Sequence, residues 1–250
     1  MKIFDAHMHI IDKRFPIYEN QGFTPDEFTS KHYKDRLLED KLVSVGGAIV
    51  SGSFQKFDQA YLIDALKDLG EGFVGVTQLP HTVTDEEILE LNQHGVRAVR
   101  FNVRRGGSED LTQLDYFARR IHELANWHVE LYIDSKALPD ISSTLKTLPK
   151  VSIDHLGLSK EGLPHLLALV HKGIRVKATG FGRINFKNPI APMKEIHEIN
   201  PNALMFGTDL PSTRANRPFH KDDVLLIKDN FSETDAERIL YKNAAAWYLD

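Results

Sequence analysis

The chain has 250 residues, which is close to what one eight-unit α/β barrel needs and short for two average domains. A net charge of −4 excludes bulk attraction to nucleic acid or anionic membranes, and no apolar stretch approaches the roughly 18–20 residues that cross a bilayer. There are no cysteines, so disulfide scaffolds and thiolate metal sites are excluded. With no signal-like segment, we expect one cytoplasmic domain over residues 1–250, without nucleic-acid or membrane partners.

Short apolar runs alternate with amphipathic segments along the chain, and we expect the runs to be strands at 3–10, 47–51, 73–79, 96–103, 129–134, 151–155, 174–180 and 204–209. The segments between them carry helical spacing, as in 58–69 and 110–126. This alternation predicts an α/β fold, a single (β/α)8 TIM barrel. An open doubly wound sheet is the alternative, but no glycine-rich phosphate turn follows the first strand.

Polar side chains gather toward the carboxyl ends of the predicted strands, where barrel enzymes carry their sites. His7 and His9 lie two residues apart, so they leave one face of the first strand. His155 and Asp209 close two later strands. Three imidazoles and a carboxylate suit one divalent ion such as Zn²⁺ with a position open for water, so His7, His9, His155 and Asp209 are the predicted metal ligands.

Two loops follow the first and last strands, at 12–30 and 211–220, and would lie over the same end of the barrel. On the fourth strand Arg100 and Asn102 share the polar face, and Tyr132 lies on the polar face of the fifth. Asp5 is expected to share the face of His7 and His9, where it would orient an imidazole or pair with Lys177.

Three short segments of the chain, which contain the predicted metal ligands, resemble the motifs of the amidohydrolase superfamily. The resemblance rests on Phe-Asp-Ala-His-Met-His at 4–9, Ser-Ile-Asp-His-Leu-Gly at 152–157 and Phe-Gly-Thr-Asp-Leu-Pro at 206–211. Segments 95–102 and 176–180, with Arg183 beyond, are similar to the branch of pyrone dicarboxylate and sugar-acid lactonases. The similarity runs from residue 3 to about residue 248.

The resemblance implies a distorted barrel that hydrolyses a lactone or related ester. Asp209 and His155 would be catalytic: Asp209 would activate water, while the histidines polarise the substrate carbonyl, directly or through a metal. Members of this branch differ in metal use, so one Zn²⁺ or Mn²⁺ ion and a metal-free site both remain open.

The resemblance also implies an anionic or sugar-derived small-molecule substrate, which Arg100 and Arg183 would bind. We expect the substrate-binding residues to be Arg100, Asn102, Arg104, Tyr132 and Arg183, with Arg105 as the alternative to Arg104. Leu158 stands where the dicarboxylate lactonases carry an arginine, which favours a sugar lactone or a monoanionic compound.

Two other functions stay open. The first is metal-dependent decarboxylation of a small unsaturated acid, for which only His81 offers the additional histidine. The second is a barrel that binds a ligand without catalysis. A homodimer is also compatible with the sequence.

Overall fold

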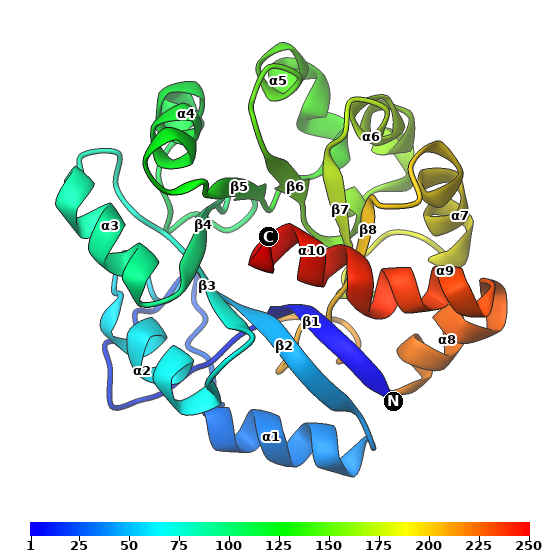
Figure 1. Cartoon of the computed structure of the whole chain (residues 1–250), viewed down its shortest axis with the longest axis horizontal. Coiled ribbons are helices and arrows are strands. Elements are labelled where there is room, and N and C mark those ends of the chain that lie inside the picture. The colour runs from blue at the N-terminus through cyan, green and yellow to red at the C-terminus, as the bar shows by residue number, and fades with distance from the viewer.

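The computed structural model describes all residues, 1–250, and shows eight parallel strands that form a nearly closed barrel (Figure 1). Each strand pairs with the next one along the chain, as the predicted alternation requires. The strands are β1 Lys2–Met8, β2 Val43–Val50, β3 Phe73–Thr77, β4 Val96–Phe101, β5 His128–Leu131, β6 Val151–Ile153, β7 Arg175–Ala178 and β8 Leu204–Phe206.

Helices follow the strands and cover the outside of the barrel (Figure 1). They are α1 Ser30–Glu39, α2 Ala60–Leu69, α3 Asp85–Gln93, α4 Leu114–Ala125, α5 Leu138–Leu145, α6 Leu163–Val170, α7 Ile190–Ile199, α8 Asp222–Asn230, α9 Glu233–Glu237 and α10 Asn243–Leu249. No helix combines the length and the apolar character needed to span a bilayer. Their buried faces and the outer faces of the strands form one continuous apolar layer.

The predicted strands are confirmed in number and order, but each ends one to three residues before its predicted end. β6 stops at Ile153 and β8 at Phe206, so His155 and Asp209 lie on the loops that follow. Both apolar runs end at these residues, and the polar residues that follow them were predicted to belong to the strands, because a sequence pattern locates an element more reliably than its last residue.

The barrel is distorted where its first and last strands meet. β1 and β8 form no ladder; instead, the His9 amide donates to the Leu210 carbonyl at 2.8 Å and the Asp209 amide to the His7 carbonyl at 2.7 Å. We call this junction the seam. Three of the predicted site residues therefore take part, through their own backbones, in closing the barrel.

A β-bulge in β1 changes the direction of Asp5. Asp5 pairs with Gly47 and Met8 with Ile49, so β1 uses three steps where β2 uses two. The Asp5 carboxylate accepts bonds from Tyr33 of α1 and from Thr208, not from an imidazole or from Lys177. Both expected roles of Asp5 are wrong, because the extra residue breaks the period of two.

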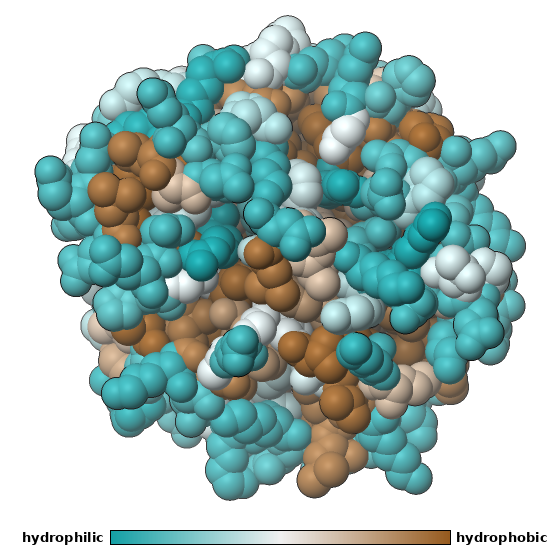
Figure 2. All heavy atoms as spheres, in the orientation of Figure 1, coloured by the Kyte–Doolittle hydropathy of each residue, from teal (hydrophilic) through white to brown (hydrophobic).

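The C-terminal helix closes the base of the barrel, the end where the strands begin. α10 lies across this opening in Figure 1, and Tyr248 stacks on Phe4 with ring centroids 5.8 Å apart. Small interior residues such as Ala48 and Ala98 leave room for Trp247 and Tyr248. Figure 2 shows the same face, with apolar side chains gathered at its centre inside a polar surround. The mouth lies at the opposite end.

Candidate active site

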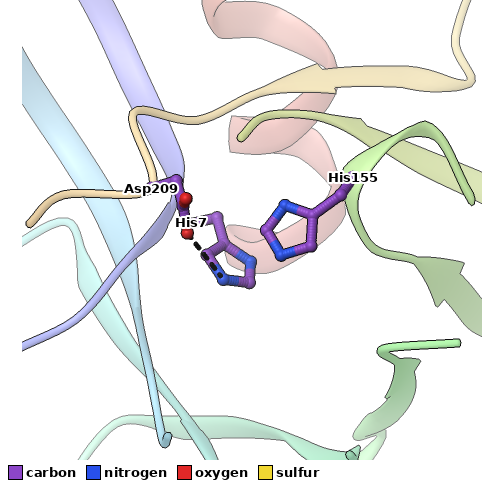
Figure 3. Close-up of side chains that lie close together, drawn as sticks. All are labelled: His7, His155 and Asp209. Atoms are coloured by element: carbon purple, nitrogen blue, oxygen red, sulfur yellow. Dashed lines mark ion pairs between the residues drawn. The ribbon is translucent and has the colours of Figure 1, made fainter. Parts of the chain in front are cut away.

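Four predicted residues converge at the mouth. The ring of His7 lies 5.0 Å from that of His9 and 4.8 Å from that of His155. Asp209 Oδ1 is 3.9 Å from His7 Nε2 and 3.7 Å from His9 Nε2 (Figure 3 shows the first of these contacts). All four side chains are almost completely buried. The structure thus brings together residues separated by as many as 202 positions in the chain.

Two glycines permit this close approach. A Cβ at Gly180 would lie 2.6 Å from His155 Nδ1, and one at Gly207 would lie 2.6 Å from the His7 amide nitrogen. His155 and Asp209 themselves have left-handed backbones, with φ of 51° and 60°. Non-glycine residues avoid this region, and such strain concentrates at functional sites.

The hydrogen bonds of His9 define its tautomer. Its Nδ1 lies 2.7 Å from the Val50 carbonyl oxygen, which can only accept a hydrogen bond, so Nδ1 carries the proton. The Nε2 of the neutral ring then presents a lone pair to Asp209 Oδ1. Two acceptors facing one another require a cation or a hydrogen-bond donor between them.

The same reasoning applies to His7, through a residue that the sequence analysis did not select. Asp154 Oδ1 lies 3.4 Å from His7 Nδ1, while its Oδ2 accepts from Arg100 Nη2 at 2.8 Å. Lys177 Nζ is also 3.4 Å from His7 Nδ1, but it is paired with Glu130 at 2.5 Å. With the proton of His7 held toward Asp154, Nε2 is unprotonated and faces Asp209.

Burial and charge set the protonation states of these groups. Burial lowers the pKa of His155 to about 4 and also lowers the pKa values of His7 and His9, so all three rings are neutral at pH 7. Burial alone would raise the pKa of Asp209, but Arg183 and the neighbouring imidazoles hold it well below its usual value. Asp209 is therefore ionised.

The residues fit a divalent metal ion. Ligand atoms of His7, His155 and Asp209 all lie within 4.8 Å of one another, and His9 Nε2 is close to the same carboxylate oxygen. His7 Nε2 and Asp209 Oδ1 are buried without a hydrogen-bond partner. Imidazole and carboxylate ligands suit Zn²⁺ and Mn²⁺. An amidohydrolase-type mononuclear site is compatible with this arrangement.

Above these residues lies a hollow, which we call the inner hollow. Its walls carry four arginines and no carboxylate. They comprise His9, Gly52, Ser53, Phe54, Arg100, Asn102, Arg105, Tyr132, His155, Arg183, Thr213 and Arg214. A neighbouring outer hollow of about 350 Å³ shares Arg105, Tyr132, Arg183 and Arg214 with it. Such walls favour an anionic ligand.

Most of the predicted substrate-binding residues line the inner hollow. Arg100, Asn102 and Tyr132 do so, and the Arg100 guanidinium lies 5.0 Å from the Tyr132 ring centroid. Arg183 lies beside them and donates from Nε to Asp209 at 2.5 Å. Arg104 is exposed and borders only the outer hollow, whereas Arg105 borders both hollows.

The sequence analysis missed two further groups at the mouth. Asp154 directly precedes His155 in the segment 152–157, and its position beside a predicted metal ligand could have identified it as a site residue. Arg214 lies in the predicted loop 211–220, which carries no periodic pattern to indicate the direction of a side chain. The additional histidine that decarboxylation would use, His81, pairs with Glu109 at 2.8 Å and does not line the inner hollow.

Known proteins share this architecture and sequence pattern. The amidohydrolase family model matches residues 4–249. A 2-pyrone-4,6-dicarboxylate hydrolase from Comamonas testosteroni is 27% identical, with 89% of this chain and 81% of the relative aligned. A 4-sulfomuconolactone hydrolase from Hydrogenophaga intermedia is 26% identical, over 96% of this chain and 86% of the relative.

Among solved structures, a probable 2-pyrone-4,6-dicarboxylic acid hydrolase from Acinetobacter baumannii with bound citric acid superposes with a TM-score of 0.84. It is 24% identical, with both chains covered completely, and supports the fold. Together with the family match, which extends over nearly the whole chain, these relatives place the protein: it belongs to the amidohydrolase family and is a hydrolase.

Proposed function

We propose that this hydrolase opens a small lactone that carries acidic groups. The main support is Asp209, an ionised carboxylate whose Oδ1 has no hydrogen-bond partner and faces the neutral imidazoles of His7 and His9. The hollow above it is lined by four arginines. Both named relatives act, by their descriptions, on lactone or pyrone substrates with acidic substituents. The arginine count favours an acidic lactone over a neutral sugar lactone, despite Leu158.

In this proposal Asp209 is the general base. A water molecule between His7 Nε2 and Asp209 Oδ1, 3.9 Å apart, would donate one hydrogen bond to each. Asp209 accepts the proton as the water oxygen attacks the lactone carbonyl, and the ring C–O bond breaks to give the hydroxy acid. His155 and His9, which line the inner hollow, face the reacting carbonyl.

Arg183 couples substrate binding to the basicity of Asp209. Its Nε donates to Asp209 and the guanidinium also contacts Tyr132, so the remaining N–H groups of its terminal nitrogens can donate to a substrate carboxylate. A substrate anion there draws part of the guanidinium charge away from Asp209 and makes the carboxylate a stronger base. A divalent ion held by His7, His155 and Asp209 would supply further acidity to the attacking water and polarise the carbonyl.

The test is a screen of pyrone carboxylates and aldonolactones, followed by pH-indicator detection of the acid released. We expect acid-bearing lactones to be turned over, and Asp209→Asn to lower kcat by about 100-fold or more through loss of the base. Asp115→Asn, at an exposed position on α4, is the matched control and should keep the wild-type rate. An Asp209→Asn enzyme with unchanged turnover would contradict the proposal.

A further inference from the structure

One wall of the inner hollow is formed by the segment 52–56, which lies between β2 and α2. Gly52, Ser53 and Phe54 of this segment line the hollow. Phe54 supplies the only side chain of the lining that has no polar atom, and it is almost completely buried. The position of Phe54 therefore decides how closely the face of a ligand ring can pack in the hollow.

Close contacts hold the backbone of the segment 52–56 on two sides. The Phe54 ring lies against Gly52, where a Cβ would be 2.5 Å from Phe54 Cζ. From the loop after β4, Gly107 approaches so closely that a Cβ there would overlap the Ser53 carbonyl oxygen. Both glycines thus allow the segment to pack tightly, and hydrogen bonds from two glutamines add to this packing.

The first glutamine, Gln55, closes the segment into a turn. Its Oε1 accepts a hydrogen bond from the Gly52 amide at 2.7 Å, and its own backbone amide donates to the Gly52 carbonyl at 3.0 Å. Its Nε2 donates to the Ile10 carbonyl at 2.7 Å, just beyond the end of β1. The side chain is completely buried, and both ends of its amide group are used.

The second glutamine, Gln78, follows β3 and joins the segment to another loop. Its Nε2 lies 3.1 Å from the Gly52 carbonyl oxygen, 2.9 Å from that of Lys56 and 3.1 Å from that of Gly107. Carbonyl oxygens can only accept hydrogen bonds, so the atom among them is the amide nitrogen and not the amide oxygen. This buried side chain therefore binds both ends of the segment to the loop after β4.

We propose that Gln55 and Gln78 are positioning residues, which hold the segment 52–56 so that Phe54 packs against the ring of the bound lactone. This inference rests on the proposed function for the identity of that ring. Neither glutamine lines the inner hollow, so both act through the segment. Asp209 and His155 lie on the loops after β8 and β6, so a loosened segment weakens ring binding and leaves the hydrolytic step unchanged.

Gln78→Met tests this role with little change in side-chain volume. Methionine cannot donate a hydrogen bond, and no acceptor bond is lost because Gln78 Oε1 has no partner. We expect the dissociation constant of benzoate, an unreactive ring acid, to rise about fivefold in isothermal titration. For the lactone turned over in the screen, KM should rise by a similar factor while kcat stays within about twofold.

Three further variants complete the series. Phe54→Ala removes the apolar contact itself and should weaken benzoate binding at least as much as Gln78→Met does. Gln55→Met should act in the same direction, because it releases the Gly52 amide. Gln93→Met, at an exposed position of α3, is the matched control and should change neither affinity nor kinetics.

Hydrogen–deuterium exchange followed by mass spectrometry locates the change in the protein. In Gln78→Met the amides of the segment 52–56 should exchange faster, while those of β5 and β7 keep their wild-type rates and show that the variant is folded. Faster exchange throughout the barrel would show a purely structural role and overturn the proposal. Unchanged exchange of the segment would overturn it as well.

The binding results separate this inference from the proposed function. Unchanged benzoate affinity in Gln78→Met, or a fall in kcat at constant KM, would overturn the positioning role. A wild-type protein that does not bind benzoate would also overturn it, because the segment would then form no ring-binding wall. Failure to hydrolyse any lactone, with the differences in benzoate affinity and exchange present, would instead remove the proposed function and leave the role of the segment standing.

Discussion

The base and the mouth of the barrel both contain buried charged groups, but they satisfy them differently. Toward the base, Lys177, Glu130, His128 and Tyr248 form what we call the base cluster, which extends up the barrel interior until Lys177 Nζ lies 3.4 Å from His7 Nδ1. In this cluster Glu130 accepts bonds from Lys177 and from the Tyr248 hydroxyl of α10. At the mouth, His7 Nε2 and Asp209 Oδ1 have no partner. Buried polar groups are normally paired, so an unpaired set at a hollow marks the place where a ligand is needed.

The base cluster should matter for stability, and it gives the largest expected effect. Glu130→Leu leaves the fully buried Lys177 ammonium without its carboxylate, which should lower the free energy of unfolding by about 3–5 kcal/mol. Urea denaturation followed by circular dichroism measures the loss. Adding Lys177→Met should restore most of it, and Glu123→Leu on the exposed side of α4 is the control. A Glu130→Leu protein as stable as the wild type would remove the distinction between the two ends.

At the mouth, Asp154 should matter for chemistry. Asp154→Asn weakens the hold on the His7 proton and on Arg100, so we expect kcat and Zn²⁺ affinity each to fall about 10- to 100-fold. Steady-state kinetics and metal titration measure the two effects. Asp140→Asn, exposed on α5, should change neither. A lower melting temperature with unchanged kcat and unchanged metal affinity would show that Asp154 stabilises the fold, as the base cluster does, and has no role in the chemistry.

The smallest effect is the dependence of activity on pH. Burial lowers the folded-state pKa of His155 to about 4, so this ring is neutral above that pH and gains a proton as the pH falls through it. We expect kcat/KM of the chelator-treated enzyme to lose about a tenth at pH 5, half near pH 4 and tenfold per unit below. Because the unfolded ring titrates near pH 6.5, its protonation also removes stability as the pH falls below that value. An acidic limb centred near pH 6.5 would indicate an exposed His155.

The sequence predicts the barrel and much of its mouth because both depend on local patterns. Strand order follows from alternating apolar segments, and His7, His9, His155 and Asp209 stand at apolar run ends that parallel topology brings together. The direction of Asp5 was not predictable, because one bulge residue reverses every later side chain of β1.

Contacts between distant irregular segments were also beyond the sequence analysis. Arg214 is positioned by Asn20, which lies 194 residues away on another loop, and neither loop has a periodicity that fixes its path.

The seam has a consequence for the order of events during synthesis. The His7 and His9 backbones are hydrogen-bonded to Asp209 and Leu210. These bonds cannot form until the ribosome has added residues about 200 positions further along the chain. Contacts of such long sequence separation form late in folding, after local strand–helix units have assembled. A nascent or truncated chain that ends before Asp209 can thus contain most of the barrel and still have no site. Hydrolytic activity should appear only after Asp209 and Leu210 have been synthesised and bonded to β1.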